Sequence, residues 1–417
     1  MRDGAIERTI RPVRRIVLGA ALFAALLPAS AAAAPVIVLD GSHAARRNDR
    51  FVPRADFVSV RSRRPSGARA EAVAAAVARP QRTPLSELAR LARARAISPA
   101  RYTEARSAYL AALDTASRLR GTRRTELAGA IAAVRLVAAR GALTASRVAP
   151  LLLTLQRNRQ WWVSGPLLAP GERVEFAGSR LVWKHYPGQG IQLQMLASFG
   201  KANALSQGGY DSGERSLLDE LVPLAARRAG GLAWEEYFAF DGGAPPWASS
   251  ITQGTAVQAL ARGSRRLGSA RYGRAARAGM RLFDAAPPAG VRVRTRVGSH
   301  YLIYSFAPRV RVLNAFLQAL IGLFDVARID PGSRARALFA AGDREARREV
   351  PHYDTGKWSL YQPGVLSSLS YHLLLRDFLR NLCARTGTSV YCRTAERFTR
   401  YLAHPQASSE RAPMRGR

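Results

Sequence analysis

Two helical segments that end at glycines limit what the first part of this chain can fold into. In SPARYTEARSAYLAALDTASRLRG (98–121), Ser98 suits an N-cap, Pro99 suits the first helical position and Gly121 suits a stop. Apolar residues recur at every third or fourth position, which gives the segment one apolar face. TELAGAIAAVRLVAARG repeats the pattern and ends at Gly141. The pattern predicts a helical bundle over 67–160 whose residues hold the fold and take no part in chemistry.

The composition changes near residue 160, because all six tryptophans and eleven of the thirteen tyrosines follow that point. Alternation in RVEFAGSRLVWKHY predicts a hairpin within 161–187, and VRVRTRV predicts a strand within 291–297. Helical patterns fill most of the remainder, at about 190–206, 212–229, 249–267, 270–285, 309–327, 332–348, 363–382 and 392–403. Paired long helices joined by aromatic loops predict a mainly α protein, with an α/α toroid over 161–405, a short β-hairpin element and the N-terminal helical bundle before it.

The first residues predict export. A basic stretch, a twelve-residue apolar core at 16–27 and small residues at 28–34 have the order of a secretory signal peptide over 1–34. The apolar core is too short for a membrane span, so we expect membrane contact only through an uncleaved signal. The protein is then secreted, extracellular or in the cell envelope. Residues 35–66 are basic and predicted to be an irregular linker, and 406–417 a disordered tail.

The two cysteines, Cys383 and Cys392, flank the turn-like sequence ARTGTSVY. An exported chain can keep a disulfide, so we expect one bridge that closes a loop between two helices. Two cysteines at this spacing do not predict a zinc site, and no metal or other cofactor motif is visible.

The formal net charge is +35, carried almost entirely by arginine, with lysine only at 184, 201 and 357. Such a surface attracts polyanions. No zinc-finger spacing, RNA-recognition signature or basic heptad helix is present, so nucleic acid is not the expected partner. The charge fits an anionic polysaccharide, and equally a generally basic solvated surface.

Three segments in order resemble the C-terminal domain of the D-glucuronyl C5-epimerases, which convert glucuronate to iduronate within heparan-type polysaccharides. They are PPWASSITQGTAVQALAR (245–262), YSFAPRVRVLNAFLQALIGLFD (304–325) and YDTGKWSLYQ with SLSYHLLLRDFL (353–379). With HYPGQGIQLQML, the resemblance covers roughly 180–403. It implies that Tyr304, Tyr361 and Tyr371 are catalytic and transfer or position protons, and that no redox cofactor is needed.

The chain departs from the family at one position of the site. The family has acidic residues directly before the tyrosine that matches Tyr304, whereas this chain has Leu302 and Ile303. Inverting C5 of a uronate needs acid/base groups on both faces of the ring and a cation for the enediolate charge. Glu235 and Glu236, with Asp241, are candidates to supply the missing carboxylate from another loop. The alternative is that they are loop carboxylates that pair with the many arginines.

The stretch YDTGKWSLYQ predicts a tight turn in which Asp354 accepts backbone hydrogen bonds and Gly356 takes a positive φ. This turn would place Lys357, Trp358 and Tyr361 on the rim of the site, with Trp358 stacking on a sugar face. Arg309 and Arg311 are further cations near the motifs, and His372 beside Tyr371 is either a ligand or a structural residue. The predicted substrate-binding residues are Trp358, Trp247, Gln253, Arg309, Asn314, Lys357 and His372.

The sequence thus predicts an exported, carbohydrate-active protein that acts on glucuronate residues in a polysaccharide by proton abstraction and return at C5. The alternative is a non-catalytic glycan-binding protein on the same scaffold, which the missing glutamate favours. A third hypothesis, an envelope protein that binds polyanions without sugar specificity, rests on charge alone.

Overall fold

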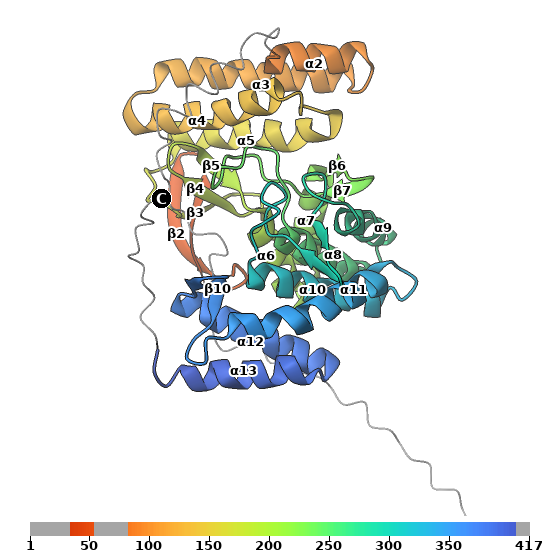
Figure 1. The fold of residues 1–417 in the computed structure, drawn as a ribbon. Helices are drawn as coiled ribbons and strands as arrows, with labels where there is room; N and C mark the ends of the chain where they lie inside the picture. The colour runs from red at the N-terminus through yellow and green to blue at the C-terminus, as the bar shows by residue number, and fades with distance from the viewer. Residues whose placement is uncertain (1–33, 54–81, 406–417) are drawn as a thin grey trace, which may run out of the picture.

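The computed structural model describes residues 34–53 and 82–405, and the fold is mainly helical with small β-hairpins (Figure 1). The N-terminal helices form one layer, a five-stranded sheet lies beneath them, and the C-terminal helices fill the rest of the molecule. The predicted signal, the tail and residues 54–81 of the predicted linker and bundle lie outside the described residues. Among the described helices, none is long and apolar enough to cross a membrane.

The N-terminal layer contains α2 (Pro84–Arg93), α3 (Pro99–Arg118), α4 (Gly121–Ala139) and α5 (Ala145–Ser164), which pack on one another. The predicted start of α3 is confirmed, because the Ser98 hydroxyl accepts from the Arg101 amide and Pro99 is the first helical residue. Its apolar face buries Ala105, Tyr109 and Ala112. The helix ends at Arg118 rather than at Gly121, which has φ +53 and begins the next helix.

The sheet beneath these helices has the order β2-β1-β3-β4-β5. Its strands are β1 (Ala34–Asp40), β2 (His43–Asp49), β3 (Arg173–Phe176), β4 (Trp183–Tyr186) and β5 (Gly190–Leu193). The predicted irregular linker over 35–66 is therefore wrong for its first part, because β1 pairs antiparallel with β2 and parallel with β3. The arginines that make β2 look like a linker find acidic partners on β3 and just before it: Arg46 lies 2.6 Å from Glu172 and Arg47 2.6 Å from Glu175.

The hairpin predicted within 161–187 is confirmed in β3 and β4, but its limits differ. Residues 161–164 complete α5, and Gly190–Leu193 forms a third strand where a helix was predicted to begin. The predicted helix at 212–229 also ends early, at Leu221, followed by a short 3-10 helix and the hairpin of β6 (Ala226–Arg228) and β7 (Gly231–Ala233). The strand predicted near 291–297 forms β8 (Arg292–Arg294), paired with β9 (Ser299–Tyr301).

The C-terminal part contains α6 (Met195–Gln207), α7 (Asp211–Leu221), α8 (Ser250–Leu267), α9 (Ala270–Gly279), α10 (Leu313–Ile329), α11 (Ala335–Glu349), α12 (Leu369–Thr386) and α13 (Ser389–Tyr401). The even-numbered helices pack side by side in order, and each odd-numbered helix packs on its even-numbered neighbour. Helices α8 and α10 cross where Gly254 meets Ala319 and Gly322. A Cβ on Gly254 would lie 2.7 Å from the Ala319 Cα, and one on Gly322 would lie 2.2 Å from the Gly254 carbonyl oxygen. Glycine at both positions therefore permits this close contact.

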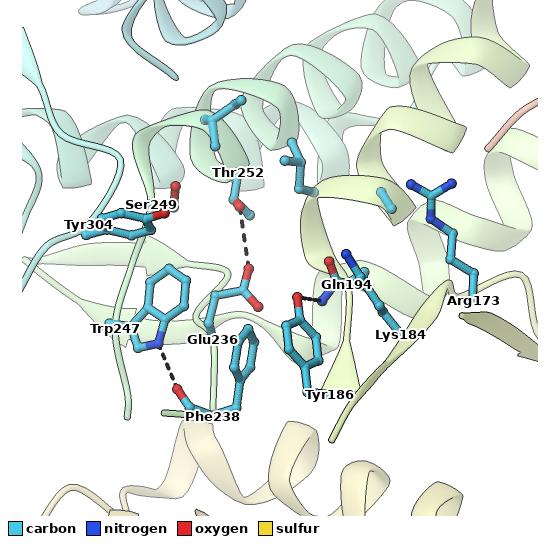
Figure 2. A pocket seen from close by; sticks show the side chains of 13 residues that line it. Arg173, Lys184, Tyr186, Gln194, Glu236, Phe238, Trp247, Ser249, Thr252 and Tyr304 are labelled. Carbon is cyan, nitrogen blue, oxygen red and sulfur yellow. Dashed lines mark hydrogen bonds between the residues drawn. The ribbon is translucent and has the colours of Figure 1, made fainter. Parts of the chain in front are cut away.

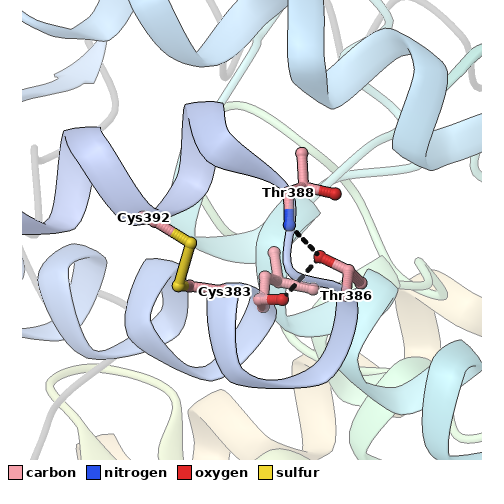
Figure 3. The surroundings of a disulfide bond; sticks show 5 residues. Cys383, Thr386, Thr388 and Cys392 are labelled. Carbon is pink, nitrogen blue, oxygen red and sulfur yellow. Dashed lines mark hydrogen bonds between the residues drawn. A yellow bond between two sulfur atoms is a disulfide. The ribbon is translucent and has the colours of Figure 1, made fainter.

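The predicted disulfide between Cys383 and Cys392 is present and joins the end of α12 to the start of α13 (Figure 3). Between the cysteines, Gly387 ends α12 with φ +65 and the Thr386 hydroxyl accepts from the Thr388 amide. The bridge therefore fastens a turn that is already closed by local hydrogen bonds.

Replacing both cysteines with alanine is expected to lower the free energy of unfolding by about 2–3 kcal/mol, because the bridge limits the unfolded chain over a short loop. Urea denaturation under non-reducing conditions measures the difference, with each variant compared at the same pH. An unchanged denaturation midpoint would show that the bridge contributes nothing to stability.

Candidate active site

Three tyrosines that are far apart in the sequence form one cluster. Tyr304 follows β9, Tyr361 lies in β10 (Leu360–Gln362), which pairs with β11 (Val365–Leu366), and Tyr371 lies in the first turn of α12. The rings of Tyr361 and Tyr371 are 4.7 Å apart. The Tyr361 hydroxyl forms hydrogen bonds with the hydroxyls of Tyr304 and Tyr371. The structure thus brings together the residues that the sequence singled out as catalytic.

Burial keeps the phenols of this cluster protonated. It raises the pKa of Tyr304 well above its ordinary value, and the nearby Tyr361 and Tyr371 add to the rise. Burial also raises the pKa of Tyr361 to about 12, although its two hydrogen bonds act in the opposite direction. Both phenols are therefore neutral at ordinary pH and suited to donate a proton.

A pocket lies beside Tyr304 and encloses about 510 Å³ of empty space, part of it open to solvent (Figure 2). Tyr304 and Trp247 lie at one side, Glu236 in the middle, and Tyr186, Lys184 and Arg173 towards the other side. The pocket thus combines aromatic surface, one carboxyl group and two cations.

The two cations come from adjacent strands and were missed in the sequence. Arg173 of β3 and Lys184 of β4 are directly paired residues in the antiparallel register. The register therefore places two positive charges side by side at the pocket. The predicted hairpin contained both residues, but only its register shows that they lie opposite each other.

Glu235 and Glu236 have opposite surroundings although they are neighbours. The Glu235 carboxylate accepts from Arg147 Nε at 2.7 Å, Arg228 Nη1 at 2.6 Å and the Tyr237 hydroxyl at 3.0 Å. It therefore pairs with arginines, as one of the two sequence hypotheses expected. Glu236 points instead into the pocket.

Glu236 is buried with few partners. Its side chain is 6% exposed, one carboxylate oxygen lies 3.5 Å from the Thr252 hydroxyl, and the other has no hydrogen-bond partner among the described residues. Its backbone is fixed by two hydrogen bonds with the backbone of Trp247. Burial raises the pKa of Glu236 to about 8, and the Thr252 hydrogen bond lowers it only in part. Such a carboxyl group in a pocket is typical of functional acid/base residues.

Three predicted substrate-binding residues are internal supports instead. Trp358 is fully buried, its ring stacks on His372 with centroids 3.7 Å apart, and its indole N–H donates to the Ser367 carbonyl. The prediction that Trp358 stacks on a sugar is therefore wrong. His372 is also buried, between the Ser359 hydroxyl and the Phe398 carbonyl. The side-chain amide of Gln253 accepts from the backbone N–H of residue 234 and donates to the carbonyls of residues 232 and 279.

The other predicted binding residues have mixed positions. Trp247 lines the pocket, as predicted, although it is only 2% exposed. Arg309 and Lys357 are exposed and do not line the pocket. Asn314 is buried near the start of α10, and neither of its amide atoms has a partner among the described residues. The turn before Lys357 is confirmed, because the Asp354 carboxylate accepts from the Gly356 amide at 2.9 Å and Gly356 has φ +82.

Residues 34–53 and 82–405 contain no group of three His, Cys, Asp or Glu side chains that could hold a metal ion.

Part of the chain is similar to known proteins. Residues 231–400 match the family model described as D-glucuronyl C5-epimerase C-terminus. A D-glucuronyl C5-epimerase of Caenorhabditis elegans is 28% identical over 178 residues, which cover 38% of this chain and 29% of that protein. Residues 231–400 are therefore similar to the C-terminal part of the D-glucuronyl C5-epimerases. The match spans less than a third of the relative's length.

Among solved structures, the endo-beta-1,4-glucanase CMCax from Acetobacter xylinum has a TM-score of 0.34 and 11% identity, over 46% of this chain and 68% of that one. A similarity at that level carries no argument about the fold. The family match, in contrast, contains Tyr304, Tyr361 and Tyr371, whereas Arg173 and Lys184 lie before it.

This chain is apolar directly before Tyr304, where the sequence analysis noted that the acidic residues of the similar family are missing. Leu302 is fully buried, and Ile303 is 1% exposed in the same apolar cluster as Tyr304 and Trp247. No carboxylate can therefore reach the pocket from these two positions, and Glu236 is the carboxyl group that lines it.

The N-terminal helices fix one wall of this epimerase-like site. The Glu126 carboxylate of α4 accepts from the Gly188 amide at 2.9 Å and the Gly190 amide at 2.9 Å, and lies 3.3 Å from His185 Nε2. Burial raises the pKa of Glu126, but the hydrogen bonds from His185, Gly188 and Gly190 outweigh it and lower the pKa overall. These contacts hold the turn between β4 and β5, the hairpin that carries Lys184 and Tyr186.

Replacing Glu126 with alanine is expected to lower the free energy of unfolding by about 2–3 kcal/mol, because buried backbone N–H groups lose their acceptor. The loss should shrink as the pH falls through the lowered pKa of Glu126, since protonation removes the same interaction from the parent. Chemical denaturation at neutral and acidic pH measures both effects, with Glu104→Ala on the exposed face of α3 as the control. Equal stability of parent and variant at neutral pH would contradict this role of α4.

Proposed function

We propose that the protein is a C5-epimerase that acts on glucuronate residues of an anionic polysaccharide. The observation that carries the proposal is the hydrogen-bonded cluster of Tyr304, Tyr361 and Tyr371 at the edge of a pocket that also holds a carboxyl group and two cations. All three tyrosines lie within the family match. The low identity and partial coverage support the epimerase class rather than a particular polysaccharide.

The chemistry fits the pocket. The proton on C5 becomes removable because the resulting charge spreads onto the uronate carboxylate as an enediolate. Arg173 and Lys184 would stabilise that charge, since cations fixed where charge develops contribute more in a pocket than in water. Neutral Tyr304 borders the pocket and would return a proton to C5, while Tyr361 and Tyr371, behind it, would position its hydroxyl and resupply the proton.

The arrangement of the C-terminal helices supports an α/α toroid scaffold for this site. The even-numbered helices α6 to α12 form a packed row, and each odd-numbered helix covers its neighbour, which is the order that such a scaffold requires. We also propose that the protein works outside the cytoplasm. The disulfide between Cys383 and Cys392 supports this, because such bonds persist in oxidising compartments.

Solvent exchange tests the proposed activity. Incubation of the protein with oligosaccharides that contain glucuronate, in deuterated water, should place deuterium at C5 and produce iduronate residues, both visible by NMR. A protein that binds these oligosaccharides without exchange would instead be the non-catalytic glycan-binding protein that the buried Ile303 favours. Binding that collapses at high salt would indicate attraction by charge alone.

A further inference from the structure

No partner within residues 34–53 and 82–405 explains the burial of Glu236. Its neighbour Glu235 is held by two arginines and a tyrosine, whereas the carboxyl group of Glu236 makes one long contact, to Thr252, in the part of the chain that the structure describes. Buried carboxyl groups are costly unless they are paired, so an almost unpaired one is expected mainly where function needs it. Figure 2 shows its carboxyl group in the middle of the pocket, between Tyr304 on one side and Lys184 on the other.

We propose that Glu236 is the second acid/base group of the site, and that it replaces the family carboxylate lost at Ile303 from a different loop. The inference rests on the proposed C5-epimerase function. A sugar ring seated between Glu236 and Tyr304 would present one face to each of them. In this chain the carboxyl group that reaches the sugar ring would come from the segment after β7 instead of from the segment before Tyr304. The pocket would still hold one carboxyl group.

The proton balance is simple. The ionised Glu236 takes the proton from C5, and the electrons of the C–H bond form the double bond of the enediolate, whose charge lies next to Arg173 and Lys184. The Tyr304 hydroxyl then gives its proton to C5 on the opposite face, and the double-bond electrons form the new C–H bond. Glu236 is left protonated and Tyr304 ionised. Exchange with solvent, and with Tyr361 at the oxygen of Tyr304, restores both groups.

The raised pKa of Glu236 supports this role, because a carboxylate that holds its proton up to about pH 8 is a stronger base than an exposed one. The groups that face it are Thr252 on α8, Tyr304 after β9, and Tyr186 and Lys184 on β4. The Glu236 carboxyl group is thus the most readily ionised of the proposed proton carriers, since burial raises the pKa of the Tyr304 phenol far higher.

The test is Glu236→Gln, measured with each C5 epimer as the starting substrate. Glu236 takes the proton from one face only, so the variant should lose exchange from that epimer by about 10²–10⁴-fold and should lose less exchange from the other. The rate of net epimerisation should fall to that of the slower of the two proton transfers. The control is Glu104→Gln, the same chemical change at an exposed position of α3, which should leave both rates unchanged.

Each outcome decides the inference. Equal losses from both epimers would indicate a structural role for Glu236 and overturn it, as would unchanged exchange in the variant. In either case the parent's own exchange would leave the proposed epimerase function intact. If the parent exchanges neither epimer, the proposed function fails and this inference fails with it. Ile303→Glu in the Glu236→Gln background adds a second readout, because recovered exchange would show that one carboxylate replaces the other.

Discussion

Replacing Tyr304 with phenylalanine is expected to lower the rate of C5 exchange by about 10²–10⁴-fold, the usual size of a general acid/base contribution. The ring packs against Trp247, Phe240 and Phe306, and phenylalanine keeps these contacts. Only the hydroxyl that borders the pocket is lost. Oligosaccharide affinity and thermal stability should therefore change little, and NMR of C5 exchange under single-turnover conditions measures the difference.

The variants Tyr371→Phe and Tyr361→Phe measure the contributions of the other two hydroxyls of the cluster. The Tyr361 hydroxyl bonds to both other hydroxyls, so its removal should disturb the position of Tyr304 as well as its proton supply. We expect both variants to lose exchange, with the loss at either smaller than at Tyr304. Tyr102→Phe on the N-terminal α3 is the matched control and should exchange at the parent rate. Full activity of Tyr304→Phe would remove it from the mechanism.

The parts of the fold that local sequence determines were predictable. Ser98 and Pro99 start α3 because their cap acts over three residues, and Gly387 ends α12 inside the short loop that the disulfide closes. The tyrosine cluster was predictable only through the family resemblance. Nothing local in the sequence shows that Tyr304 and Tyr371 share a hydrogen-bond partner.

The first hairpin was not predictable in the same way. The arginines of β2 have partners more than a hundred positions later, where Arg46 bonds Glu172 and Arg47 bonds Glu175. A basic segment reads as a solvated loop until those partners are known. The pairing of Arg173 with Lys184 likewise depends on strand register, which the sequence left open.

The sequence also did not show which side chains are buried. The sequence showed Trp358 beside the tyrosines but not that His372 would cover its face, so an internal stack was taken for a sugar platform. For Glu235 and Glu236, the sequence likewise did not show which carboxyl group is paired and which one faces the pocket. The two hypotheses for them, catalysis and pairing with arginine, are divided between the two residues, because adjacent side chains of this extended segment point to opposite sides.

Replacing Glu236 with glutamine is expected to stabilise the protein at alkaline pH. Burial raises the pKa of Glu236 from 4.5 to about 8. A group whose folded pKa is raised contributes stability below the unfolded value and loses it as the pH rises through the folded value. The parent should therefore weaken between about pH 4.5 and pH 8 relative to the variant, whose amide does not titrate. Above that range the difference should reach about 3–5 kcal/mol, from 1.36 kcal/mol for each pKa unit.

Denaturation of parent and Glu236→Gln at pH 5 and pH 9 measures this difference, with Glu104→Gln as the exposed control. The sign of the stability difference between variant and parent at pH 9 distinguishes two states of the pocket. If Glu236 is an ionised partner of Lys184 in the empty pocket, the variant should be the less stable protein at pH 9, because breaking a buried pair leaves the other charge alone. If it is the nearly unpaired carboxyl group described here, the variant should be the more stable one. A gain in stability together with a loss of C5 exchange is the combination expected of a residue kept for its chemistry, since such sites often reduce the stability of the fold that carries them.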